Sequence, residues 1–354
     1  MRRVTGITCL TAGVLRLPAN TGTTTYPRRP DRDLIHSFNF IVERELPWNM
    51  KGTVGYVGTR VKNQMGFINI NASAPGTGQN GRPLFQRFGF TQDINEIKPY
   101  GDTSYDSLQT SLNRRWASNS SFGVVYTWSK AINYADNDAN PRIQYLPQKE
   151  HNKGLAGYNR THNLQVYGVM DLPFGKGQKW DGGNSFVNFL IGGWQVNTII
   201  SAMSGTPFNI VQGTAGSLQA AGSGQYPHLL REINILGGIG RGNPYFNNTV
   251  TGIAGPRNCT SNCDFASENG AQFGSAPRNF LTGPAYINVD AGVFKRIPIT
   301  ERVDLQLRIE ALNLLNEANF GNPQGDINNN DFGFITNTIG IGERNLRFAA
   351  RISF

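Results

Sequence analysis

Apolar and polar side chains alternate one by one in several segments of the chain. In the clearest segment, from Val303 to Ala311, five apolar residues alternate with four polar ones, Asp304, Gln306, Arg308 and Glu310. A helix would spread these polar residues around every face, whereas an extended strand places all of them on one face. The last eleven residues of the chain repeat the pattern. The alternation therefore predicts two strands, each with one apolar and one polar face.

Weaker copies of the same pattern lie upstream and are separated by turn-forming residues. The predicted strands are 36–46, 51–60, 104–116, 121–132, 162–172, 192–201, 286–296 and 301–313, followed by the C-terminal strand. Short turns at 47–49, 117–120, 173–177 and 298–300 alternate with long polar connections, above all 205–284 and 316–343. Outer-membrane β-barrels have short periplasmic turns and long external loops. A soluble β-sandwich also alternates, but it has shorter loops than these.

The fold class predicted is all-β: an antiparallel transmembrane β-barrel portion of about nine or ten strands, incompletely closed, with long extracellular loops. Side chains should then separate by parity, because an arginine facing the bilayer midplane costs about 2–4 kcal/mol. The residues predicted to face lipid are Leu305, Leu307, Ile309, Phe348 and Ile352, and those predicted to face the lumen are Gln306, Arg308, Glu310, Arg347 and Arg351. On the lumen face, Arg308 and Glu310 are expected to form a solvated ion pair.

Composition agrees with a β-barrel and excludes helical membrane proteins. The chain is 38% hydrophobic and 16% charged, with 42 Gly and a mean hydropathy of −0.37. It contains no apolar stretch near the roughly 20 residues that a spanning helix needs. The net charge of +9 comes from scattered basic residues, whereas a nucleic-acid-binding protein would show a basic run or stripe. We therefore expect solvated loops and a polar lumen, with no nucleic-acid partner.

Two of the three cysteines, Cys259 and Cys263, lie in the segment NCTSNC with three residues between them. No histidine is near, and a zinc site would need two further ligands at suitable spacing. Thioredoxin-like redox motifs have two intervening residues instead of three. The pair is predicted to form a short-loop disulfide in an oxidising compartment, with a pair of free thiols as the alternative.

Several long segments together resemble the barrel domain of Oar-like TonB-dependent transporters. They include FNFIVERELPWNMKGTVGYVGTRV (38–61), YNRTHNLQVYGVMDLPFGKGQKW (158–180), GGWQVNTIISAMSGTPFNI (192–210), DLQLRIEALNLLNEANFGNP (304–323) and the terminal RFAARISF (347–354). The resemblance covers nearly everything after about residue 33. It implies a bacterial outer-membrane barrel of about 22 strands with a plugged lumen. Phe354 resembles the terminal aromatic of the signal read by the barrel-assembly machinery.

The chain departs from that family in lacking a recognisable plug domain, TonB-box segment and secretion signal. Residues 1–32 form a poorly defined N-terminal segment, and 33–354 are expected to be the C-terminal part of a transporter-like barrel, with the preceding part missing. The expected role is a passive structural and pore-wall one. The expected partners are outer-membrane lipid, the barrel-assembly machinery and, only through the missing plug, the TonB complex. The alternative is a non-transporting surface or adhesion protein built on a barrel.

No motif with catalytic or metal-binding spacing survives inspection. The Asn-rich run 326–331 lacks the Gly and Glu of a calcium loop, Gly238 to Gly242 precede Asn243-Pro244 instead of a helix, and the four histidines are far apart. We therefore expect no catalytic residues, no cofactor and no metal site. The substrate cannot be read from this sequence.

Overall fold

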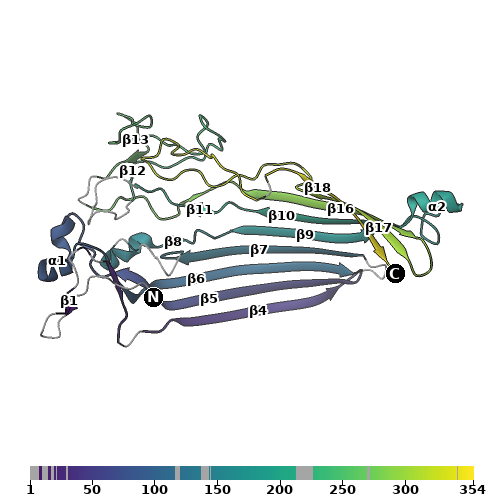
Figure 1. The fold of residues 1–354 in the computed structure, drawn as a ribbon, viewed down its shortest axis with the longest axis horizontal. Coiled ribbons are helices and arrows are strands. Elements are labelled where there is room, and N and C mark those ends of the chain that lie inside the picture. The colour runs from purple at the N-terminus through teal and green to yellow at the C-terminus, as the bar shows by residue number, and fades with distance from the viewer. Residues whose placement is uncertain are drawn as a thin grey trace.

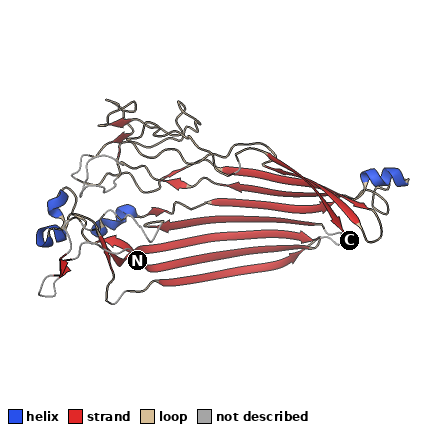
Figure 2. Cartoon of the chain, in the orientation of Figure 1, coloured by secondary structure: helices blue, strands red, loops and turns tan. Residues whose placement is uncertain are grey.

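The computed structural model describes residues 8–9, 15–16, 20, 22–28, 31–115, 120–136, 143, 145–212, 226–268, 272–340 and 342–354. Within these ranges nearly all of the regular secondary structure is β-strand (Figure 2). None of the helices in the described ranges is long and apolar enough to cross a membrane.

One large antiparallel sheet dominates the fold, with its main strands in the order β18-β17-β16-β10-β9-β7-β6-β5-β4. Chain neighbours pair with each other throughout, so the connectivity is a meander. The short strands β3 (Thr23–Thr25) and β8 (Gly154–Leu155) pair with β6 and β7 away from this path. The main strands are β4 (Leu34–Leu46), β5 (Met50–Asn69), β6 (Ile94–Arg115), β7 (Ser121–Asn133), β9 (His162–Asp171), β10 (Trp194–Met203), β16 (Tyr286–Pro298), β17 (Asp304–Leu312) and β18 (Asn345–Ser353).

The sheet does not close. Within the described residues, β4 pairs only with β5 and β18 pairs only with β17. Every residue of both edge strands is exposed. The nine main strands alternate in direction, so the first and the last run the same way, and joining them would require a parallel ladder. The predicted open, meandering sheet is therefore confirmed.

Long connections gather at one end of the strands and short turns at the other (Figure 1). The end with the long connections, on the left in Figure 1, carries η1 (Gly78–Gly81), α1 (Pro83–Phe88) and η2 (Leu146–Asn152). We call it the loop end, and the opposite one the turn end. The connection 172–193 at the turn end is an exception to the short turns, because it contains the helix α2 (Ser185–Ile191).

The predicted strands match the observed ones closely, and the main difference lies in β5 and β6. These strands have 20 and 22 residues and extend beyond the predicted segments toward the loop end. There the exposed ion pair of Lys62 with Asp102 (Nζ to Oδ2, 2.6 Å) joins the two strands. The extension also carries Ile68 and Tyr100, which are buried in a small hydrophobic core with residues that follow β7. Residues 117–119 of the predicted turn, residue 116 at the end of the preceding predicted strand, and most of the N-terminal segment 1–32 lie outside the described residues.

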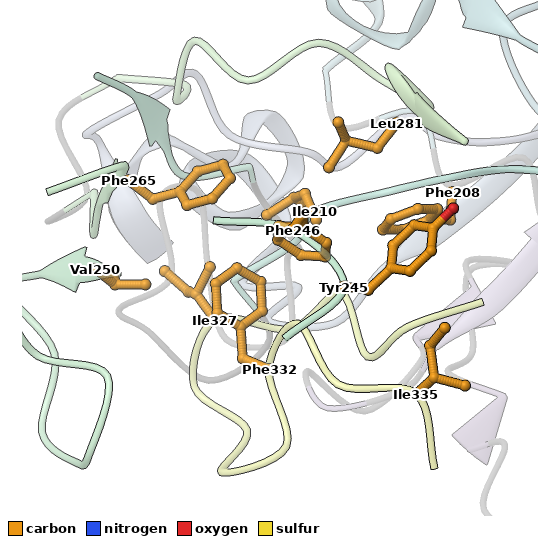
Figure 3. Close-up of a cluster of buried hydrophobic side chains, with 10 residues drawn as sticks. All are labelled: Phe208, Ile210, Tyr245, Phe246, Val250, Phe265, Leu281, Ile327, Phe332 and Ile335. Atoms are coloured by element: carbon orange, nitrogen blue, oxygen red, sulfur yellow. The ribbon is translucent and has the colours of Figure 1, made fainter. Parts of the chain in front are cut away.

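The loops at the loop end contain a hydrophobic core of their own, which the sequence analysis did not predict. Ten buried residues from the connections 204–285 and 313–344 pack together (Figure 3). Four of the rings, Phe246, Phe265, Phe332 and Phe208, make tilted or edge-to-face contacts with centroids 5.5–6.4 Å apart. We call this folded unit the loop cap. Its short strands are β11 (Pro207–Phe208), β12 (His228–Leu229), β13 (Val250–Thr251), β14 (Phe265–Ala266) and β15 (Leu281–Thr282).

Candidate functional site

The large sheet has one apolar and one polar face. Directly paired residues in an antiparallel sheet carry their side chains on the same face. One such row crosses five strands and consists only of aliphatic residues: Leu112, Val124, Val166, Ile200 and Val289. A continuous row of this kind on an unpartnered face is typical of a surface that contacts lipid or another protein.

The same apolar face continues through the last three strands. Val293, Ile309 and Phe348 are paired in register, and their exposed fractions are 38%, 48% and 73%. Along β16, the stretch from Ile287 to Lys295 spans about 27 Å at about 3.4 Å per residue. A strand tilt of about 40° reduces this to about 20 Å, close to the apolar band of an outer-membrane barrel.

Amides and hydroxyls on the opposite face form a hydrogen-bonded ladder. The Ser201 hydroxyl donates to Oε1 of its cross-strand partner Gln165 (2.6 Å), and the Gln165 amide donates to Asn163 Oδ1 (2.9 Å). Farther toward the turn end, Tyr167 Oη donates to Asn113 Oδ1 (2.8 Å). Such a face suits a water-filled or plugged interior, where each polar group finds a partner or a water molecule.

The residues predicted to face the lumen share this polar face in the register. Glu310 is paired directly with Arg347, and Gln306 with Arg351. The expected ion pair between Arg308 and Glu310 is absent. Instead Arg308 donates from Nε and Nη2 to Gln306 Oε1, at 2.9 and 2.6 Å, and its guanidinium lies over the Phe294 ring. Residues two apart on a strand are about 7 Å apart at their Cα atoms, so Gln306 and Glu310 lie at similar distances from Arg308 along the strand.

Charged side chains on the apolar face include groups near both ends of the strands. At the loop end, Arg60 Nη2 contacts Asp106 Oδ1 at 2.8 Å, and Tyr56 Oη donates to the same carboxylate. At the turn end, Lys295 is paired in register with Trp194. Aromatic and cationic side chains in these positions are typical of the two interfaces that flank an apolar band.

A buried arginine attaches the loop cap to the strand wall. Arg278, 6% exposed, donates from Nη1 to Asn133 Oδ1 (2.7 Å) and contacts Asp136 Oδ2 through Nη2 (2.8 Å). Burial alone would raise the pKa of Asp136, but hydrogen bonds from Asn133 and the Gly157 N–H, together with Arg278, hold that pKa below its usual range. The cap therefore sits on the connection that follows β7.

A tyrosine next to this anchor supports the same connection. Burial, followed by a hydrogen bond from its hydroxyl to Glu150 Oε1 (2.7 Å), raises the pKa of Tyr134 to about 12. The ring belongs to a small core with Ile68, Tyr100 and Ala135. The loop end is thus a set of packed units in the described part of the chain.

Cys259 and Cys263 are joined by a disulfide in the structure, with Cα atoms 5.9 Å apart. They lie in the connection 204–285 between β10 and β16, which are neighbouring strands. The bridge is therefore at the loop end, within the cap. Its oxidation state in the protein stays a prediction that thiol alkylation can test.

The Asn-rich run 326–331 forms part of a shallow polar hollow on the cap, together with Arg241. Arg241 Nη2 contacts Asp331 Oδ2 at 2.9 Å, and Asp326 Oδ1 accepts a hydrogen bond from the Asn328 N–H (3.0 Å). The Asp326 oxygen is thus used within the turn, as in an Asx turn, and the Asp331 oxygen by an arginine of the other connection. The described residues contain no group of three or more His, Cys, Asp or Glu side chains placed to hold a metal ion.

The terminal Phe354 follows β18 directly and is fully exposed. Its predicted part in assembly is not tested by its position. The loop cap and α2 were missed by the sequence reasoning. The available signal was the recurrence of aromatic residues within the long connections, such as Phe208, Tyr245 and Phe246.

Comparison with known proteins identifies a family for nearly the whole chain. The family model described as "Outer membrane beta barrel domain" matches residues 5–347. No curated protein matches the chain. Solved structures similar to the chain include two outer-membrane proteins. The outer membrane transporter YddB from Escherichia coli has a TM-score of 0.48, 8% identity, and coverage of 96% of this chain and 35% of that chain. The ferric enterobactin receptor PfeA from Pseudomonas aeruginosa has a TM-score of 0.40, 10% identity, and coverage of 91% and 31%. The chain thus spans about a third of the length of these proteins.

Proposed function

The chain belongs to the outer-membrane β-barrel domain family, and we propose that it forms the C-terminal part of the wall of a barrel of the TonB-dependent transporter type. The protein resides in the bacterial outer membrane. Its proposed role is structural and passive: the apolar face contacts lipid, and the polar face, with Arg308, Glu310, Arg347 and Arg351, lines the lumen. We propose no enzymatic activity and assign no substrate.

The observation that carries the proposal is the pair of unpaired edges of the sheet. Exposed backbone N–H and C=O groups on β4 and β18 could not remain unsatisfied in lipid, where each costs several kcal/mol. Further strands must therefore complete the wall. The resemblance of the strand segments to Oar-like transporters supports the transporter class, in which about 22 strands enclose a plug.

The experiment is an immunoblot of outer membranes from the source bacterium, using antibodies raised against the loop cap. The proposal expects a species much heavier than the 38.9 kDa of this chain, and a plug-domain reading frame immediately upstream in the genomic DNA. A folded species at 38.9 kDa, with no plug frame upstream, would refute it. If the heavier species and the plug frame are found, solutes whose energised uptake requires the TonB complex would identify the transported class.

The loop cap favours one alternative, a surface or adhesion protein that does not transport. A cap with a hydrophobic core and a disulfide, such as that around Phe246 and Cys259, could act without a pore. Purified cap-bearing protein that binds cell or abiotic surfaces, in cells whose uptake is unaffected by its loss, would support this reading over the transporter.

Assembly into the membrane is proposed to use the terminal Phe354. Replacing it with alanine should reduce the amount of heat-modifiable, folded protein in the outer membrane. The matched control is Phe348→Ala, which removes the same side chain from β18 without changing the terminus. Equal loss from both variants would show that Phe354 acts only as one more apolar side chain.

A further inference from the structure

The helix α2 lies at the turn end of the wall, inside the connection between β9 and β10 (Figure 1). Its N-terminus is capped by Asn184, whose Oδ1 accepts a hydrogen bond from the Val187 N–H (2.8 Å). One side of the helix is tied to its own loop, because the Asn188 amide donates to Asp181 Oδ1 (2.8 Å) and Asn188 Oδ1 accepts from the Gly182 N–H (2.8 Å). The helix is therefore held rigidly within the connection.

The opposite side of α2 is apolar and has no protein covering it in the described structure. Phe186, Phe189 and Leu190 are 71%, 52% and 51% exposed. Their spacing of i, i+3 and i+4 places all three on one face of the helix. Two exposed phenylalanines and a leucine at adjoining positions are costly in water, at about 25 cal/mol per Å² of apolar surface.

Two residues of the apolar wall face hold the C-terminal end of α2. Trp194 Nε1 donates to the Leu190 carbonyl (2.8 Å). Lys295, 8% exposed, donates from Nζ to the carbonyls of Phe189 (2.6 Å), Leu190 (3.1 Å) and Gly192. Its ammonium also lies 5.6 Å from the Phe189 ring centroid and 5.0 Å from that of Trp194.

These contacts determine on which side of the wall α2 sits. Trp194 and Lys295 are register partners, and they share a face with Val196 and Val293, two positions along their strands. This is the apolar face. The exposed stripe of α2 is thus continuous with the apolar face, and it lies just beyond the end of the apolar band.

We propose that α2 is an interfacial helix whose Phe186, Phe189 and Leu190 insert into the phospholipid leaflet at the turn end of the barrel. An amphipathic helix at such a boundary buries its apolar face about 5–10 Å into the headgroup and acyl region. Lys176 and Lys179, exposed in the same connection, supply positive charge for anionic headgroups. The occupant is therefore a phospholipid surface with an anionic component. The inference rests on the proposed lipid contact of the apolar face.

The test is site-directed spin labelling of the whole gene product in phosphatidylethanolamine–phosphatidylglycerol vesicles. Single cysteines are introduced as Phe186→Cys, Phe189→Cys and Leu190→Cys in a background in which Cys9, Cys259 and Cys263 are serine. The heat-modifiable mobility of each variant on a gel verifies folding. The label is then relaxed with oxygen, which concentrates in lipid, and with a water-soluble nickel chelate.

Two control positions calibrate the measurement: Phe348→Cys on the apolar wall face and Asn330→Cys on the loop cap. We expect the α2 labels to relax more with oxygen than with nickel, as at Phe348, and the label at Asn330 to show the reverse. Removing phosphatidylglycerol should shift the α2 labels toward the nickel chelate and leave Phe348 unchanged.

The outcomes separate this inference from the proposed function. Labels on α2 that respond mainly to nickel would place the helix in water, and weak response to both reagents would mean that protein covers it. Either result, with Phe348 still in lipid, overturns the interfacial helix alone. A water-exposed label at Phe348 would overturn the lipid contact of the wall and the helix proposal with it.

Discussion

The two faces of the wall can be distinguished by placing the same charge on two adjacent residues of β7. Val124 belongs to the apolar row, between Leu112 and Val166, whereas Val125 lies on the polar face between Ser111 and Gln165. The substitutions Val124→Arg and Val125→Arg therefore change the same side chain at the same depth. We expect the first to destabilise the protein in membranes and the second to be tolerated.

The magnitude follows from the position of Val124 within the apolar band. It lies two residues, or about 7 Å along the strand, from the row in which Phe122 pairs with Arg114. Arginine costs about 2–4 kcal/mol at the bilayer midplane and about 0–1 kcal/mol near the interfaces. We therefore expect a cost of about 2 kcal/mol for Val124→Arg, roughly a thirtyfold shift in the folding equilibrium, and less than about 0.5 kcal/mol for Val125→Arg.

The assay is guanidinium unfolding of the whole gene product from phospholipid vesicles, followed by tryptophan fluorescence and by heat-modifiable mobility on gels. The difference between the two variants is read from the shift of the midpoint at constant slope. Equal destabilisation by both substitutions, or a larger cost for Val125→Arg, would refute the assignment of the apolar face to lipid.

Three further outcomes are expected. Arg278→Ala should loosen the loop cap by about 3 kcal/mol, because it leaves Asp136 without its cationic partner and the buried Asn133 Oδ1 without this donor. Limited proteolysis should then cleave the cap while the wall stays intact, and Arg278→Lys should restore little. Unchanged cleavage would contradict the role of Arg278 as an anchor. Mass spectrometry of unreduced protein should find Cys259 and Cys263 protected from alkylation. Free alkylation of both thiols would show that the disulfide is not formed. Hydrogen bonds from Asn188 and the Gly183 and Gly177 N–H groups lower the pKa of Asp181, so their stabilisation is complete above about pH 4 and is lost as the pH falls through the lowered folded value. Trp180 fluorescence should therefore change as the pH falls below about 4 in the wild type but not in Asp181→Asn, and a pH-independent wild-type signal would contradict this role.

The strands were predictable because their signal is local and repeated. In β17, the polarity of each residue indicates which face of the sheet its side chain lies on. The alternation of residues such as Leu307 and Arg308 therefore fixes how β17 aligns with neighbouring strands that alternate in the same way. The bounds of β17, predicted as 301–313, are observed as Asp304–Leu312. The open sheet was predictable from the number of strands, because nine or ten strands are fewer than the about 22 of a complete barrel of this class. Which face contacts lipid in the membrane remains a prediction.

The loop cap was not predictable from periodicity, because its core joins segments far apart in the chain. Phe208, Phe246, Phe265 and Phe332 meet in one cluster, yet none lies in an alternating run. Their pairing depends on which wall strands are neighbours, since β10, β16 and β17 bring the two connections together. The same holds for α2, a helix of seven residues, which is too short to be stable alone and depends on Asn184, Lys295 and Trp194.

The direction of the edge strands limits what can complete the barrel. Because β4 and β18 run the same way, an antiparallel barrel needs an odd number of additional strands. A single added hairpin contributes two strands and would leave the same conflict. A barrel of about 22 strands leaves about 13, which is odd. A second copy of this wall in the same membrane orientation would add nine strands, but its edge strands run the same way as β4 and β18, so both junctions between the copies would be parallel. Strand direction therefore favours an extension of the same polypeptide over pairing between copies, and the size of the outer-membrane species tests this, because the extension requires a chain much heavier than 38.9 kDa.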